Sequence, residues 1–136
     1  VCAACIANGH CELQDLAQSM GVTINPFPNR TEFSPVDVTH ADYGFDPNSC
    51  VLCTRCVRTC AEIEGANVWQ TIDRGEYAHV TTTSESWAFA DHCTSCGLCV
   101  DVCPTGALFD KSQNVGQMKK DCGLVKRLNS SQKDNV

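Results

Sequence analysis

The stretches CVLCTRCVRTC, at residues 50–60, and CTSCGLCVDVCP, at residues 93–104, form the strongest pattern in the sequence. In each stretch, gaps of two, two and three residues separate four cysteines, so together they hold eight of the 12 cysteines in a chain of 136 residues. A disulfide framework has no reason to repeat identical gaps, and a zinc ribbon takes two ligands from each loop rather than three. The repeated run therefore predicts two equivalent iron-sulfur sites.

The gaps match those of bacterial two-cluster ferredoxins, in which three closely spaced cysteines bind one [4Fe-4S] cluster and the fourth binds the other. We therefore expect two [4Fe-4S] clusters with crossed ligands, one on Cys50, Cys53, Cys56 and Cys103, and the second on Cys93, Cys96, Cys99 and Cys60. The predicted fold is α+β, a two-cluster ferredoxin-like domain of two loop-helix units flanked by short strands. Ala61 follows Cys60 where Pro104 follows Cys103, so we expect the first half to turn differently.

Composition divides the chain into four segments: an N-terminal cluster-binding helical segment (1–25), an irregular connector (26–49), the ferredoxin-type domain (50–110) and a basic tail (111–136). In the first segment, apolar residues from Leu13 to Met20 recur at helical spacing. In the third, residues 67–73 and 76–83 flank Arg74 and Gly75 and predict a β-hairpin, which we expect to be a peripheral decoration. Apolar residues of the tail recur near helical spacing, although Gly123 disfavours a helix there.

Three further cysteines, Cys2, Cys5 and Cys11, offer one ligand fewer than a [4Fe-4S] cluster requires. His10 is the immediate neighbour of Cys11, so we expect it on the surface or outside the ligands. Neither His40 nor His79 stands at a ligand spacing, so neither receives a role. Cys122 is isolated in the tail and is expected to be a free, partly buried thiol.

The chain carries a formal charge of −6, unevenly spread. Residues 1–110 hold four Lys and Arg against 14 Asp and Glu, whereas residues 111–136 hold six against two. An acidic body does not favour nucleic-acid binding, and apolar runs of about six residues fall far short of the roughly 18 that cross a bilayer. With no secretory signal, we expect a cytoplasmic protein. No nucleophile paired with a base and no glycine-rich phosphate loop occurs, so we predict no catalytic site in this chain.

Residues 2–17, CAACIANGHCELQDLA, resemble the H-x3-C-x2-C-x5-C motif of the iron-sulfur subunits of NADH-oxidising complexes. Further matches are FPNR at residues 27–30, EIEGA at 62–66, CPTGA at 103–107 and VGQMK at 115–119, beside the two cysteine runs. Together they most resemble the diaphorase iron-sulfur subunit of bidirectional NAD-reducing nickel-iron hydrogenases, and this resemblance extends over nearly the whole chain.

The resemblance implies a histidine four positions before Cys2, outside this sequence, and a plant-type [2Fe-2S] domain further upstream. With that histidine, Cys2, Cys5 and Cys11 would bind a third [4Fe-4S] cluster in the full-length protein. The implied function is an electron relay between an NADH-oxidising FMN/iron-sulfur subunit and the small subunit of a hydrogenase. The alternatives are the electron-input module of complex I or of an NAD-dependent formate dehydrogenase, or a diffusible two-cluster ferredoxin.

Overall fold

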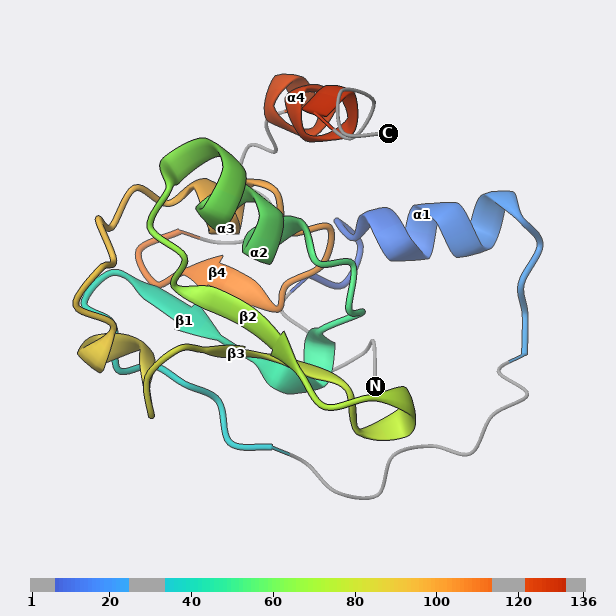
Figure 1. Cartoon of the computed structure of the whole chain (residues 1–136). Coiled ribbons are helices and arrows are strands. Elements are labelled where there is room, and N and C mark those ends of the chain that lie inside the picture. The colour runs from blue at the N-terminus through green and yellow to red at the C-terminus, as the bar shows by residue number, and fades with distance from the viewer. Residues whose placement is uncertain (1–6, 25–33, 114–121, 132–136) are drawn as a thin grey trace.

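The computed structural model describes residues 7–24, 34–113 and 122–131. This part of the chain contains short helices and short strands (Figure 1), which agrees with the mixed helix and strand fold that the sequence predicts. In chain order the elements are α1 (Glu12–Ser19), β1 (Tyr43–Phe45), η2 (Pro47–Ser49), α2 (Arg55–Arg58), η3 (Thr59–Glu64), β2 (Trp69–Ile72), η4 (Gly75–Tyr77), β3 (His79–Thr82), η5 (Trp87–Phe89), α3 (Leu98–Asp101), β4 (Leu108–Asp110) and α4 (Cys122–Ser131).

Two antiparallel strand pairs lie beside the central helices α2 and α3 (Figure 1). β1 pairs with β4, with Gly44 opposite Phe109, and β2 pairs with β3, with Gln70 opposite Thr81. Gly44 allows the first pairing, because a Cβ at this position would lie 2.3 Å from the Phe109 ring. The connector is thus not irregular throughout, since its residues 43–45 form a strand against the end of the cysteine-rich region.

The two cysteine runs fold alike up to the third cysteine. Leu52 and Ser95, at equivalent positions, both have φ of 55°, and the next equivalent pair, Thr54 and Gly97, have φ of 59° and 74°. These left-handed residues bend each loop tightly, although only one of the four is glycine. A four-residue helix follows each loop, α2 or α3. The sequence repeat is therefore also a repeat of backbone conformation.

After those helices the two halves diverge, as the difference between Ala61 and Pro104 predicts. α2 continues directly into the π-helix η3, which ends at Gly65 with φ of 80°. The carbonyl of Cys60 accepts hydrogen bonds from the N–H groups of Ala66 at 3.0 Å and Asn67 at 3.4 Å. In the second half Pro104 has no N–H to continue a helix, so the chain leaves α3 within one turn.

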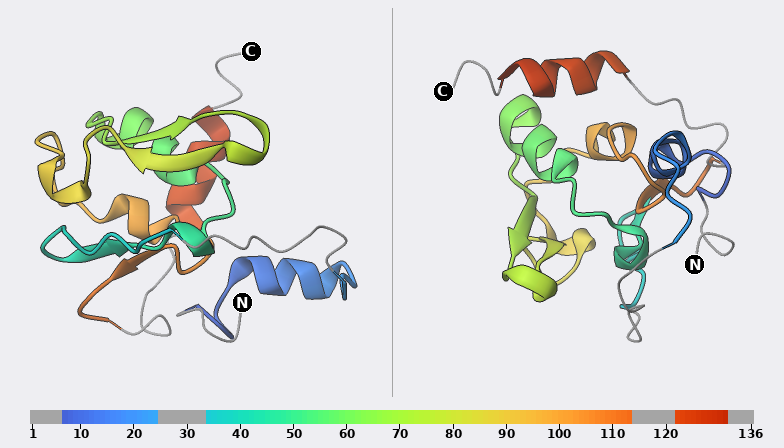
Figure 2. Two further views of the ribbon diagram at one scale, coloured as in Figure 1. Left: turned by 90° about the horizontal axis from the view of Figure 1, so that it is seen from below. Right: turned by 90° about the vertical axis from the view of Figure 1, so that its right-hand side faces the viewer.

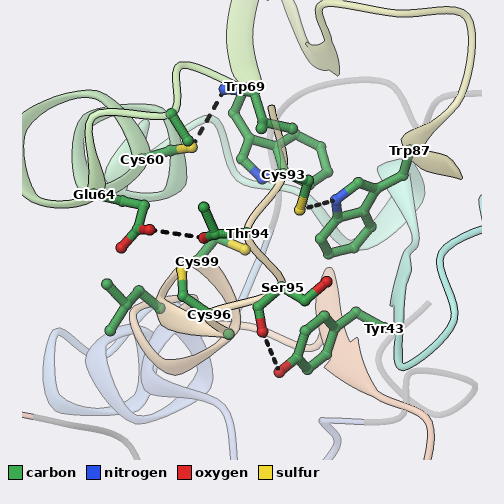
Figure 3. Close-up of a pocket in the computed structure, with 14 residues that line it drawn as sticks. Tyr43, Cys60, Glu64, Trp69, Trp87, Cys93, Thr94, Ser95, Cys96 and Cys99 are labelled. Atoms are coloured by element: carbon green, nitrogen blue, oxygen red, sulfur yellow. Dashed lines mark hydrogen bonds between the residues drawn. The ribbon is translucent and has the colours of Figure 1, made fainter. Parts of the chain in front are cut away.

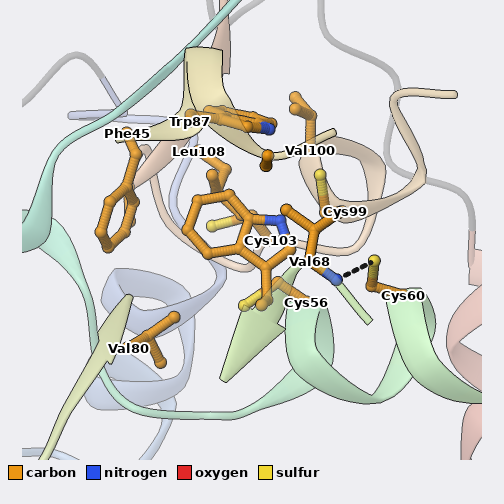
Figure 4. Packing of buried hydrophobic residues seen from close by; sticks show 13 residues of the cluster. Phe45, Cys56, Cys60, Val68, Val80, Trp87, Cys99, Val100, Cys103 and Leu108 are labelled. Carbon is orange, nitrogen blue, oxygen red and sulfur yellow. Dashed lines mark hydrogen bonds between the residues drawn. The ribbon is translucent and has the colours of Figure 1, made fainter. Parts of the chain in front are cut away.

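The hairpin formed by β2 and β3 is present as predicted, but the expectation that it is peripheral is wrong. Its Trp69 is 3% exposed, Val68 just before it 2%, and Val80 on the partner strand 3%. These side chains pack with Phe45 and Trp87 in one core that also contains the buried cysteines (Figure 4). Burying a Trp side chain of roughly 200 Å² contributes about 5 kcal/mol before entropy costs, so the hairpin stabilises the centre of the molecule.

The first and last helices lie outside this core (Figure 2). Helix α1 forms where predicted, but its apolar residues are exposed, Leu16 by 57% and Met20, which follows the helix, by 73%. Helix α4 includes Gly123 and anchors through the fully buried Leu124, which packs with Val102 of the segment after α3. The expected helical residues 115–121 lie outside the described residues. Of the helices in the described ranges, none is long and apolar enough to cross a membrane.

Candidate iron-sulfur sites

The eight cysteines of the two runs line two hollows of similar size. The first holds about 320 Å³ of empty space, part of it open to solvent, and its walls include Cys50, Cys53, Cys56 and Cys103. The second holds about 350 Å³, and its walls include Cys60, Cys93, Cys96 and Cys99 (Figure 3). Each hollow thus combines three cysteines of one run with the fourth cysteine of the other, which is the crossed grouping expected from the spacing.

The exposure of the thiols repeats between the two sets. Cysteines at equivalent positions of the two runs have the same exposure. Cys50 and Cys93 are half-buried and Cys53 and Cys96 are exposed, whereas the last two cysteines of each run, Cys56 and Cys60 or Cys99 and Cys103, are buried. In the described ranges, no three Cys, His, Asp or Glu side chains converge on a point where one ion could sit. The sulfur atoms are instead distributed around the walls of each hollow.

The chemistry of the thiols fits a cationic iron-sulfur group in each hollow. Burial raises the pKa of Cys56, and negative charge on neighbouring thiolates, Cys103 first, raises it further. Burial also raises the pKa of Cys53, and it raises that of Cys99 to about 12. Four soft sulfur ligands forced together are stable as thiolates only when metal compensates their charge, and such ligand sets suit iron-sulfur clusters.

The first hollow borders the N-terminal segment and the start of α2. Arg55 forms a two-pronged ion pair with Glu12 of α1, at 2.8 and 2.9 Å, so its charge is shared with a carboxylate. Thr105 lies 3.7 Å from the sulfur of Cys103, but its hydroxyl donates to the carbonyl of Ser49 at 2.8 Å. The Thr105 proton is therefore directed at the backbone and not at the sulfur.

The second hollow is lined by aromatic residues and supplies N–H donors to its sulfur atoms (Figure 3). The N–H of Val68 donates to Sγ of Cys60 at 3.3 Å, and the indole Nε1 of Trp87 donates to Sγ of Cys93 at 3.4 Å. Burial raises the pKa of Cys99, and a hydrogen bond from the Trp69 side chain opposes that rise. Hydrogen bonds to sulfur of this kind tune the potential of iron-sulfur clusters.

His40 belongs to the second hollow's surroundings, although no motif or spacing singles it out. Its Nδ1 accepts N–H groups of Asp42 at 3.1 Å and Tyr43 at 3.3 Å. The ring proton of a neutral His40 is therefore on Nε2, which lies 3.1 Å from Oγ of Ser95 and 3.9 Å from Sγ of Cys93. His40 and Cys93 are 53 residues apart in the sequence, so no local motif could predict this contact.

The N-terminal cysteines are described only in part, because Cys2 and Cys5 lie outside the described residues. Cys11 is 7% exposed, and its Sγ lies 3.7 Å from the carbonyl oxygen of Pro104, which also accepts the N–H of Glu12 at 3.0 Å. Cys11 is therefore adjacent to the segment that carries Cys103. His10 is exposed, as expected, and the backbone of Cys122 begins α4.

Comparison with known proteins identifies related chains. The NADP-reducing hydrogenase subunit HndD of Solidesulfovibrio fructosivorans is 34% identical over 80% of this chain and 19% of its own length. A G-type subunit of the NADH-quinone oxidoreductase of Rhizobium meliloti is 38% identical over 79% of this chain and 12% of its own. The chain thus spans about a fifth or less of these relatives.

A solved structure and two family models agree with these relatives. The crystal structure of an NAD+-reducing [NiFe]-hydrogenase in the H2-reduced state matches with a TM-score of 0.71 and 30% identity, over 83% of this chain and 48% of that one. Residues 44–109 match the ferredoxin-like domain of NADH-quinone oxidoreductase subunit 3, and residues 1–26 match the NADH-ubiquinone oxidoreductase-G iron-sulfur binding region. Residues 1–26 and 44–109 therefore resemble iron-sulfur domains of NADH-quinone oxidoreductases.

Proposed function

We propose that this chain is an electron-transfer part of an NAD-linked hydrogenase, relaying single electrons between an NADH-oxidising FMN/iron-sulfur subunit and the small subunit of a nickel-iron hydrogenase. The observation that carries the proposal is the pair of cysteine-lined hollows within a ferredoxin-like domain. The hydrogenase structure, which matches over most of this chain, supports hydrogenase as the terminal enzyme.

The proposed ligands follow the two hollows. Cys50, Cys53, Cys56 and Cys103 would hold the first [4Fe-4S] cluster, and Cys93, Cys96, Cys99 and Cys60 the second. A third [4Fe-4S] cluster would use Cys2, Cys5 and Cys11 with a histidine supplied from upstream. The contact of Cys11 with Pro104 supports a third site next to the first one.

The clusters supply reversible one-electron chemistry, and the polypeptide supplies their spacing and surroundings. The two hollows are neighbours, because Cys56 of the first and Cys99 of the second belong to one buried cluster. Buried apolar side chains that line the first hollow, among them Phe45 and Leu108, keep water from its inner sulfur atoms. N–H groups such as that of Val68 compensate negative charge on the sulfur ligands.

Metal analysis and two cysteine variants test the proposal. The protein purified anaerobically should contain about eight irons and eight sulfides in these two sites. Cys60→Ala should damage the cluster of Cys93, Cys96 and Cys99, whereas Cys103→Ala should damage the cluster of Cys50, Cys53 and Cys56, and EPR should show different components lost. Stoichiometric zinc without labile sulfide would overturn the proposal. Loss of the cluster of its own run by each variant would overturn the crossed ligand sets.

An alternative to hydrogenase as the terminal enzyme is complex I, because the Rhizobium meliloti relative is 38% identical over 79% of the chain. Purification of the tagged native complex, followed by mass spectrometry, separates the two. Recovery of a nickel-iron hydrogenase small subunit supports the hydrogenase proposal, and recovery of quinone-reducing complex I subunits replaces it with the alternative.

A further inference from the structure

We propose that Trp87 sets the reduction potential of the second cluster by donating an indole hydrogen bond to the Cys93 ligand. Nε1 of Trp87 lies 3.4 Å from Sγ of Cys93, and the Trp87 side chain is 2% exposed (Figure 3). The inference rests on the proposed function, because it requires Cys93 to be a cluster ligand.

The physical basis is the charge that the ligand sulfur gains on reduction. Reduction of a cluster held by Cys93 would add one electron, supplied by the proposed NADH-oxidising partner, and no covalent bond would form or break. The added negative charge spreads onto the ligand sulfur atoms, so an N–H donor stabilises the reduced cluster more than the oxidised one. Burial of the indole strengthens this difference, because Trp87 is 2% exposed and water does not compete for its N–H. The indole N–H therefore makes the second cluster easier to reduce.

The surrounding contacts hold the indole in this orientation. Oδ2 of Asp37 accepts the backbone N–H of Trp87 at 2.9 Å, and Oγ1 of Thr39 accepts the N–H of Ala88 at 3.0 Å, so both anchor η5. The Trp87 ring packs against His40 and Trp69, with both centroid distances 4.8 Å. Burial raises the pKa of Asp37, but hydrogen bonds from Thr39 and Trp87 outweigh it and keep the pKa below its ordinary value. The anchor is therefore a charged carboxylate at neutral pH.

Both tryptophans of the chain line the second hollow, whereas the described residues that line the first include none. Thr105 is close to Cys103 in the first hollow, but its hydroxyl proton is already donated to Ser49. The two hollows therefore differ in their indole donors. A relay benefits from such a difference, because unequal potentials of neighbouring clusters influence which of them holds the electron.

The experiment compares potentials in the full-length holoprotein by EPR-monitored redox titration. Trp87→Phe keeps an aromatic ring and removes the donor. Tyr43→Phe is the matched control, because Tyr43 lines the same hollow and stacks on Trp87, but its hydroxyl faces the carbonyl oxygen of Ser95 at 3.4 Å and not a sulfur. The signal lost in Cys96→Ala identifies the second cluster.

We expect Trp87→Phe to shift the one-electron equilibrium of the second cluster toward the oxidised form by roughly two- to tenfold, up to about 59 mV more negative. The first cluster in this variant, and both clusters in Tyr43→Phe, should keep their potentials. Resonance Raman should show altered Fe–S(Cys) stretching only in the Trp87 variant. Replacing Trp87 with 3-benzothienylalanine, which has the same shape without the N–H, should reproduce the shift.

The outcomes separate the two proposals. An unchanged second-cluster potential in a fully iron-loaded Trp87→Phe protein would overturn the role of Trp87 and leave the proposed function intact. Absence of a second cluster from the wild-type protein would overturn the proposed function itself. Should Trp87→Phe lose its cluster, the benzothienylalanine protein decides, and a wild-type potential there would refute the inference.

Discussion

Gly97 illustrates how a single residue shapes a cysteine loop. Its φ is +74°, and a Cβ at this position would lie 2.7 Å from the hydroxyl oxygen of Tyr43. The equivalent Thr54 in the first loop has nearly the same φ, of 59°, but carries a side chain. The left-handed conformation alone therefore does not demand glycine here. The close approach of Tyr43 does.

We predict that Gly97→Ala destabilises the protein by about 1 kcal/mol more than Gly75→Ala. Gly75 also has a positive φ, of 63°, but has open space around its Cα, so it reports the conformational cost alone. The midpoint of thermal loss of the cluster absorbance should fall by a few degrees further for the Gly97 variant. Adding Tyr43→Phe should recover part of that loss, and equal midpoints for the two glycine variants would contradict the argument.

At the residue scale, sequence spacing groups the cysteines that line each hollow, but it does not find the side chains that contact them. The eight cysteines can be grouped from their gaps alone, because each loop must close on itself locally. His40 and Trp87 reach the same hollow through tertiary packing. No periodicity records such contacts, so only the folded chain reveals them.

At the scale of elements, the two halves differ most in the segments after their four-residue helices. Residue 61 lies inside the π-helix η3, whereas Pro104 ends the second helical unit. We predict that Ala61→Pro costs about 3 kcal/mol, because proline removes a helical N–H and clashes with the preceding turn. Pro104→Ala serves as the control and should cost less than about 1 kcal/mol. Denaturant unfolding of the anaerobic proteins would measure the free energy that each variant loses. Similar losses for the two variants would show that the helical conformation of η3 does not exclude proline at position 61.

None of the residues of helix α1 is buried, and in the described part of the chain its first residue, Glu12, joins it to Pro104 and Arg55. Its amides should therefore exchange at least roughly tenfold faster than those of η3 and α3, as measured by hydrogen-deuterium exchange. Glu12→Gln, which breaks the ion pair with Arg55, should speed exchange in α1 by roughly two- to fivefold and leave α3 unchanged. The control is Glu62→Gln, which breaks the 2.9 Å pair with Arg58. Slower exchange in α1 than in α3 would refute this prediction.

At the scale of the whole molecule, core and metal sites are not separate. Four cysteines of the two hollows belong to the same buried cluster as Val68 and Leu108, and the chain's two tryptophans line the second hollow. This explains why the expected peripheral placement of the hairpin is wrong. Its alternation of apolar and polar residues predicts a strand pair, but says nothing about which face another segment covers. The hairpin that supplies these additional core residues lies between the two cysteine runs and is not part of the repeat.

Removal of iron should therefore unfold much of the protein. We predict that chelation under reducing conditions raises tryptophan fluorescence severalfold, because both indoles lose a nearby quenching cluster and their packing, and that near-UV circular dichroism is largely lost. Reconstitution with iron and sulfide should reverse both changes. In Trp87→Phe the remaining signal reports Trp69 alone. A metal-free protein with native circular dichroism would show that the core forms without its clusters.

The crossed lining of the two hollows has a consequence for populations of molecules under oxygen. Each cysteine run contributes to both sites, so damage at one site loosens a loop that the other depends on. A molecule that has lost one cluster should therefore lose the other faster under oxygen than an intact molecule loses its first. Native mass spectra of a partly oxidised sample would then contain fewer half-loaded copies than two independent losses would give.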